Sequence, residues 1–116
     1  MSYNLLLNTN FINNNTLKNW KLTNCEFVNG YLVSNDTIFS IEQEIVLTDP
    51  TKLYFSMDYI CFDKNITAIY CGIQTDEVLE SIKVKPKLNK RKRVSVVDDV
   101  KQEKIKVILI CESKVT

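Results

Sequence analysis

Apolar and polar residues alternate along much of the chain, which is the period of a half-buried β-strand rather than of a helix. The clearest alternation lies in residues 37–47 and in residues 53–62. The first segment places on one face Phe39, Ile41, Gln43, Ile45 and Leu47. The second places on one face Leu53, Phe55, Met57, Tyr59 and Cys61. These two faces are predicted to line the core.

Turn-forming residues separate the alternating segments. Asn29-Gly30 is the strongest hairpin signal, because both central residues of a type I′ turn need positive φ. Thr48–Thr51 and Asp63–Asn65 predict two further turns. A polar loop is predicted at Asn10–Asn19, a loop or a single helical turn at Thr75–Glu80, and a polar connection at Asp98–Lys104. The predicted strands are Tyr3–Asn8, Cys25–Val28, Tyr31–Ser34, Thr37–Leu47, Leu53–Phe62, Ile66–Gln74, Ile82–Lys85, Arg93–Val97 and Ile105–Cys111.

Composition agrees with an all-β fold. The 116 residues include a single alanine, Ala68, the best helix former, and many residues that suit a pleated surface. This length fits one hydrophobic core, and no linker or composition shift marks a second domain. About eight strands at spacings near ten residues are typical of a sandwich or barrel. We therefore predict one domain over residues 1–116, an antiparallel two-sheet jelly-roll sandwich.

Catalytic and metal-binding chemistry find little support in the composition. The chain has no histidine, the commonest general base and metal ligand, and its formal net charge is only +1. The four cysteines form no CxxC pair, so they are predicted to be reduced, buried hydrophobes. Asp98-Asp99, with Asp49 or Asp63, lacks the spacing of a calcium loop. We predict a non-enzymatic protein with no metal and no cofactor.

The order of landmarks in the first half resembles a known family. Asn4-Leu5-Leu6-Leu7-Asn8 opens the chain, Phe11 and Trp20 follow, and a hairpin ends in Gly30–Val33. Ile41–Leu47 and Leu53–Met57 come next. This order resembles carbohydrate-binding modules of the galactose-binding-like jelly-roll type. The resemblance covers roughly residues 4–62 and implies the same fold and a glycan-binding surface.

Aromatic and polar residues supply candidates for that glycan-binding surface. Trp20 either stacks on a sugar ring or anchors the core, as a lone tryptophan in a small domain often does. Strand tyrosines either line a groove or pack half-buried with a solvated hydroxyl. The candidate carbohydrate-binding residues are Trp20, Tyr31, Tyr54, Asp58, Tyr70 and Gln74.

One cluster of positive charge stands out. Its members are Lys83, Lys85, Lys87, Lys90, Arg91, Lys92 and Arg93. It is either a patch that binds nucleic acid, phosphate or an acidic partner surface, or a solvated hairpin tip beside an edge strand guarded by lysines. No aromatic residue interleaves with these cations, which disfavours binding of single-stranded nucleic acid.

The ends of the chain and the overall composition suggest a setting. No signal peptide and no transmembrane segment are predicted. Together with an Asn-, Lys- and Ile-rich composition, this favours a bacteriophage virion protein made in the host cytoplasm, decorating a capsid or associated with a tail or fibre. Such a structural module would dock on other virion proteins, could form a homo-oligomer and could contact host glycans. The alternative function is a carbohydrate-binding module that recognises polysaccharide by aromatic stacking.

Overall fold

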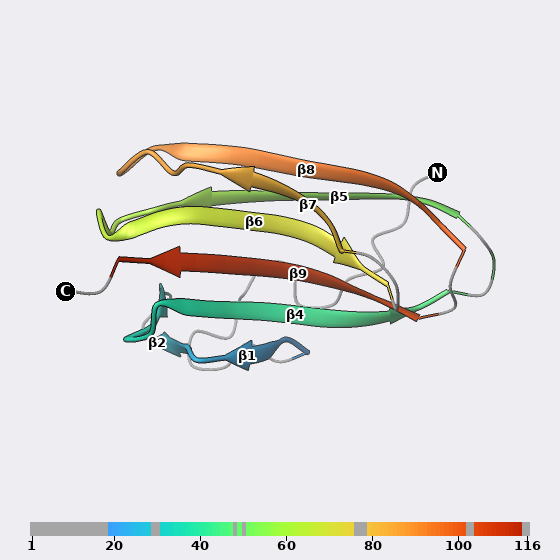
Figure 1. Ribbon diagram of the computed structural model, residues 1–116, viewed down its shortest axis with the longest axis horizontal. Helices are drawn as coiled ribbons and strands as arrows, with labels where there is room; N and C mark the ends of the chain where they lie inside the picture. The colour runs from blue at the N-terminus through green and yellow to red at the C-terminus, as the bar shows by residue number, and fades with distance from the viewer. Residues whose placement is uncertain are drawn as a thin grey trace.

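A computed structural model describes residues 19–28, 31–47, 49, 51–75, 79–101 and 104–114. The described part of the chain contains strands and no helix, as predicted (Figure 1). In chain order the strands are β1 (Lys21–Thr23), β2 (Glu26–Val28), β3 (Tyr31–Val33), β4 (Ile38–Val46), β5 (Thr51–Ile60), β6 (Ile66–Gln74), β7 (Leu79–Val84), β8 (Arg91–Val100) and β9 (Lys104–Ser113).

Five strands form one antiparallel sheet in the order β1-β4-β9-β6-β7. β9 lies at its centre, and it carries the most continuous apolar run of the chain, with Ile105, Val107 and Cys111 buried. The β4–β9 ladder runs without a break from Ile38 opposite Glu112 to Val46 opposite Lys104. β7 lies at one edge, where Lys83 fits the predicted guarding of an edge strand by charge.

The strands β5 and β8 pair over ten residues in a separate antiparallel ribbon, and Figure 1 shows this ribbon beside β6 and β7. The main core cluster contains residues of both sheets, among them Phe55 and Val96 of the ribbon and Ile41 and Ile73 of the five-stranded sheet. The core faces predicted from the alternation in β4 and β5 are therefore confirmed. Gln43 is buried within the β4 face, as its position in that pattern requires.

The third sheet is the small hairpin of β2 and β3. Val28 pairs with Tyr31, which confirms the predicted hairpin, while its turn at Asn29-Gly30 lies outside the described residues. Asn24 has φ 59° between β1 and β2, in the left-handed region that asparagine tolerates better than most residues. The predicted strand Tyr3–Asn8 also lies outside the described residues.

In the second half of the chain, the bounds of β7 and β8 differ from the predicted bounds. β7 begins at Leu79, not Ile82, and ends at Val84, while β8 extends over Arg91–Val100 instead of Arg93–Val97. The polar connection predicted at Asp98–Lys104 is therefore wrong at both of its ends. The physical reason is pairing with β5, which continues as far as Thr51 opposite Val100 and thus overrides the low strand propensity of Asp98 and Asp99.

No membrane-spanning helix is found among the residues that the structure describes.

Candidate functional site

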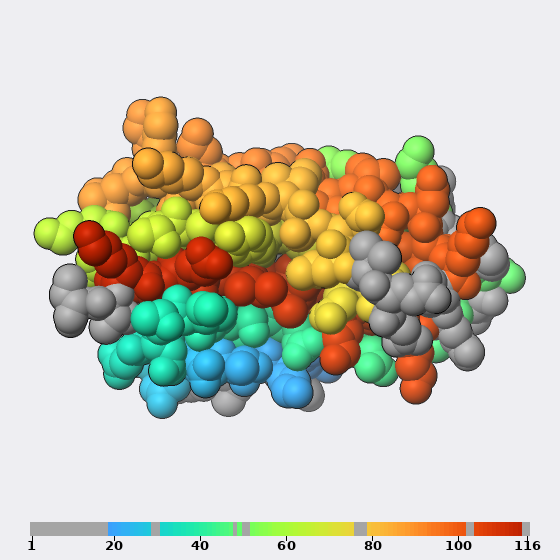
Figure 2. Space-filling view, viewed as in Figure 1, coloured from blue at the N-terminus to red at the C-terminus, as the bar shows by residue number. Residues whose placement is uncertain are grey.

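The seven predicted cations lie at the end of β7, on the turn that joins β7 to β8 and at the start of β8, a stretch that we call the cationic segment (Lys83–Arg93). The segment lies at the end of the molecule where β9 also ends (Figure 1) and stands out from the surface there as orange atoms (Figure 2). Asn89, with φ 62°, provides the left-handed turn residue. The Asn89 N–H donates to the Cys61 carbonyl at 2.8 Å, which ties the segment to the end of β5.

Most of these cations form no ion pair with a described residue. Arg93 pairs with Asp58, and the Lys83 ammonium lies 5.7 Å from the centre of the Tyr70 ring. The remaining five form no ion pair with any described residue: Lys85, Lys87, Lys90, Arg91 and Lys92. All of them except Lys92 are exposed. The four exposed cations Lys85, Lys87, Lys90 and Arg91 therefore carry positive charge that no ion pair with a described residue neutralises.

The Arg93–Asp58 pair shows how the segment interacts with a carboxylate. Arg93 Nε donates to Asp58 Oδ1 at 2.8 Å and Nη2 donates to Asp58 Oδ2 at 3.1 Å. The hydrogen bond from Arg93 lowers the pKa of the Asp58 carboxyl, and the same bond raises the pKa of Arg93. Both side chains are largely exposed, so this arrangement forms in contact with water.

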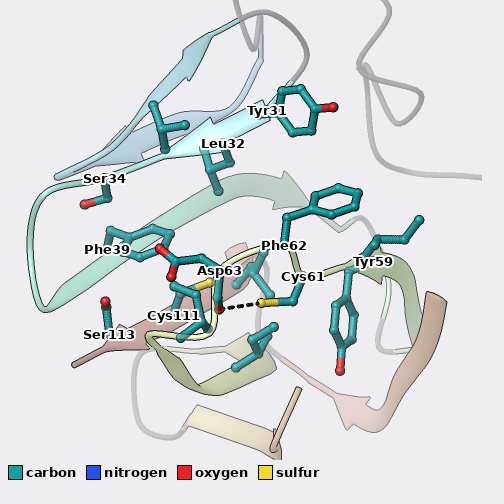
Figure 3. Close-up of a pocket in the computed structure, with 15 residues that line it drawn as sticks. Tyr31, Leu32, Ser34, Phe39, Tyr59, Cys61, Phe62, Asp63, Cys111 and Ser113 are labelled. Atoms are coloured by element: carbon teal, nitrogen blue, oxygen red, sulfur yellow. Dashed lines mark hydrogen bonds between the residues drawn. The ribbon is translucent and has the colours of Figure 1, made fainter. Parts of the chain in front are cut away.

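An apolar cleft of about 490 Å³ opens at the same end of the molecule. Its floor is the second core cluster of Phe39, Ile69 and Cys111. Tyr31 and Phe62 stand at its mouth, and their rings meet edge to face with centroids 5.7 Å apart (Figure 3). Both rings remain more than half exposed. The cleft therefore combines a floor of buried apolar residues with exposed aromatic rings at its mouth.

The cleft and the cationic segment share a wall. Ile60 and Cys61 line the cleft, and Ile60 pairs with Arg91 in the β5–β8 ladder. Leu88 forms an isolated parallel bridge with Cys61, next to the hydrogen bond from Asn89. Positive charge on one side of this wall therefore lies next to apolar surface on the other.

The six candidate carbohydrate residues do not form one site. Trp20 is 9% exposed and belongs to the main core cluster, as the core interpretation expects. Tyr54 and Asp58 lie on the face of β5 that points away from the core. Tyr70 and Gln74 lie on the outward face of β6, and of the six only Tyr31 lines the cleft.

A second, polar hollow of about 400 Å³ involves Gln74. It is lined also by Glu44, Thr75, Lys104, Ile105 and Lys106. Glu42, the other outward glutamate of β4, lies 3.4 Å from the Lys106 ammonium. Two carboxylates on one strand face are thus accompanied by lysines, an arrangement typical of a solvated surface.

The cysteines and acidic pairs form no metal site in the part of the chain that is described. All four cysteines are free thiols, and Cys61, Cys71 and Cys111 are buried, which fits the prediction of small buried hydrophobes. Cys61 Sγ donates to the Asp63 carbonyl at 3.3 Å (Figure 3). Asp98 and Asp99 are consecutive strand residues, so their side chains point to opposite faces of the ribbon.

Phe62 was missed as a functional residue by the sequence reasoning. A signal was available, because Ile60 and Phe62 are apolar at even positions of the segment whose other even positions, Tyr54, Ser56 and Asp58, face water. Two exposed apolar residues next to a turn break that pattern, which is typical of a binding surface.

Comparison with protein-family models, with curated proteins and with solved structures found no match to this chain.

Proposed function

We propose that this protein is a non-catalytic docking module that binds an acidic surface of another protein through the cationic segment. The observation that carries the proposal is the group of five cations in the cationic segment that form no ion pair with a described residue, on a stretch that the Asn89 hydrogen bond ties to Cys61 just after β5. Unpaired, exposed charges of one sign on an ordered turn attract a complementary surface and steer its approach.

A protein partner fits this patch better than a nucleic acid. No aromatic residue lies within Lys83–Arg93 to stack on a base, and the whole chain carries a formal net charge of only +1. The proposed architecture is a jelly-roll sandwich, supported by the packing of the β5–β8 ribbon over the five-stranded sheet. The proposed setting is a bacteriophage particle, in which such a module docks on other virion proteins.

The test uses poly-L-glutamate as a stand-in for an acidic protein surface, with binding measured by calorimetry at low and at physiological salt. The wild type is expected to bind and to lose affinity as salt rises, because exposed charges are screened. The cation variant is expected to lose most of this binding. This variant carries four substitutions, namely Lys85→Ser, Lys87→Ser, Lys90→Ser and Arg91→Ser.

A matched control keeps the same change in net charge but leaves the segment intact. In this control, serine replaces four other exposed lysines, namely Lys21, Lys52, Lys101 and Lys104. Equal loss of binding in both variants would show that only net charge matters and would contradict the proposal. Tighter binding of an oligothymidylate than of poly-L-glutamate would point to nucleic acid instead.

A glycan-binding function is the second candidate, and it is favoured by the exposed rings of Tyr31 and Phe62 at the mouth of the cleft. Aromatic faces next to polar groups such as Asp63 and Ser34 are suited to a sugar ring. A glycan array probed at two salt concentrations separates the two functions. Saturable, salt-insensitive binding to one sugar class would support the glycan function.

A further inference from the structure

Exposed apolar side chains gather where the cationic segment meets the cleft. Tyr31 is 55% exposed, Phe62 58% and Leu88 47%, and Val33 and Ile60 are also exposed. Four of these five line the cleft, and Leu88 is bridged to the lining residue Cys61. Monomeric proteins rarely expose apolar residues in such groups unless the surface binds something.

The cleft itself has the size and chemistry for one large apolar side chain. Its volume of about 490 Å³ falls in the range of pockets that hold compact ligands. Phe39, Ile69 and Cys111 close its floor without exposing a charged group. The one carboxylate at its rim, Asp63, is engaged in its own turn, where Oδ1 accepts from the Asn65 N–H at 2.8 Å.

The positive charge next to the cleft indicates what kind of molecule carries the side chain that the cleft would bind. The cationic segment adjoins the other side of the wall formed by Ile60 and Cys61, because Arg91 lies opposite Ile60 and Leu88 is bridged to Cys61. Five cations of this segment form no ion pair with a described residue. An occupant that reaches from the cleft across this wall must therefore be acidic outside its apolar anchor. An acidic polypeptide segment with one aromatic residue meets both requirements, whereas a neutral sugar would leave the cations unused.

We infer that the cleft binds an aromatic side chain of the same acidic protein segment whose carboxylates pair with the cationic segment. This inference rests on the proposed docking function and specifies its partner. The anchor supplies affinity by burial of apolar area, and the carboxylates supply orientation and on-rate. Edge-to-face contact with Tyr31 or Phe62 favours an aromatic anchor over an aliphatic one.

The experiment compares two fluorescein-labelled peptides made of glutamates, one with a central phenylalanine and one with a central alanine, by fluorescence anisotropy. The wild type is expected to bind the phenylalanine peptide about tenfold more tightly, from burial of the ring. Phe62→Ala is expected to remove most of this preference and to leave the salt-dependent binding of both peptides. Tyr54→Ala, which removes an exposed ring outside the cleft, should leave the preference unchanged.

The outcomes separate the two proposals. If neither peptide binds in a salt-dependent manner, the docking function itself fails. If both bind equally, or if Phe62→Ala keeps the preference, the docking function stands and the aromatic anchor is wrong. A neutral phenylalanine peptide that binds as tightly as the acidic one would also overturn the inference. Val33→Ser provides a second cleft variant if Phe62→Ala does not fold, as judged by circular dichroism.

Discussion

Asp58 and Arg93 face each other across β5 and β8 and form a two-point ion pair on the outer face of the ribbon. Arg93 is the only cation of the cationic segment that forms an ion pair with a described residue. The pair therefore occupies a guanidinium that would otherwise be available to an acidic partner. If the protein docks as proposed, Asp58 competes with the acidic partner for Arg93.

Asp58→Asn is expected to strengthen binding of poly-L-glutamate by about twofold to fivefold, because it releases Arg93 from an exposed pair of modest strength. Asp99→Asn is the matched control, since it makes the same charge change on the same outer face but near the other end of the ribbon. Calorimetry at low salt measures both. Equal gains in the two variants would mean that the ion pair does not restrain Arg93.

Tyr59→Phe is expected to leave stability unchanged or to raise the free energy of unfolding by about 1 kcal/mol. The Tyr59 hydroxyl is fully buried and has no hydrogen-bond partner among the described residues, so its removal relieves an uncompensated desolvation cost. The same desolvation raises the pKa of Tyr59. Urea unfolding checks this, with the exposed Tyr54→Phe as a neutral control. A clear loss of stability would show that the hydroxyl has a partner after all.

Trp20→Ala is expected to destabilise the fold by about 3–5 kcal/mol, because it removes a large side chain from the main core cluster. Trp20→Phe should recover part of this loss. Unfolding followed by circular dichroism measures both variants. If Trp20→Ala stays as stable as the wild type but loses binding on a glycan array, Trp20 acts as a sugar platform and not as a core anchor.

The fold could be predicted from sequence where the alternation is strong and local. The buried face from Phe39 to Leu47 was evident, since a period of two specifies which side chains share a face. The length of β8 was not, because Asp98 and Asp99 are poor strand residues that pairing with β5 holds extended. Pairing partners such as β4 and β9 are far apart in sequence, and no local pattern identifies them.

The candidate site likewise has one part that the sequence predicts and one part that it does not. The cationic segment is contiguous, so its charge could be read along the chain. The cleft is assembled from β3, β4, β5, β6 and β9 together with the residues after β3 and β5. Tyr31 and Phe62 become neighbours only when the hairpin packs against the end of β5. Such a site depends on the tertiary arrangement, which the alternation alone leaves undetermined.

Gly72→Ala is expected to destabilise the protein by about 1–3 kcal/mol through overpacking. A Cβ atom at Gly72 would lie 2.8 Å from the Glu80 carbonyl oxygen and 2.9 Å from Ser81 Cβ, so β7 would have to move away from β6. Hydrogen exchange should show the loss of protection first in β7. Ser81→Ala keeps the Cβ and provides the control. Full protection of β7 in Gly72→Ala would show that the added Cβ is accommodated without separating the two strands.

Stability is expected to fall as the pH rises above about 9, because burial keeps two thiols protonated in the fold. Burial raises the pKa of Cys71 from 9.0 to about 11. Burial, with smaller contributions from Cys25 and Cys61, raises the pKa of Cys111 from 9.0 to about 12. Above pH 9 the unfolded chain releases these protons while the folded chain retains them, so unfolding becomes more favourable. Each thiol contributes a slope of about 1.4 kcal/mol per pH unit.

Urea unfolding in a reducing buffer between about pH 8 and pH 10.5 measures this slope, which includes contributions from other groups that titrate there. The double variant Cys71→Ala, Cys111→Ala isolates the two thiols. It should be less stable than the wild type at neutral pH, because both side chains are buried, yet lose less stability as the pH rises. A slope identical to that of the wild type would show that the two thiols already ionise freely in the folded protein.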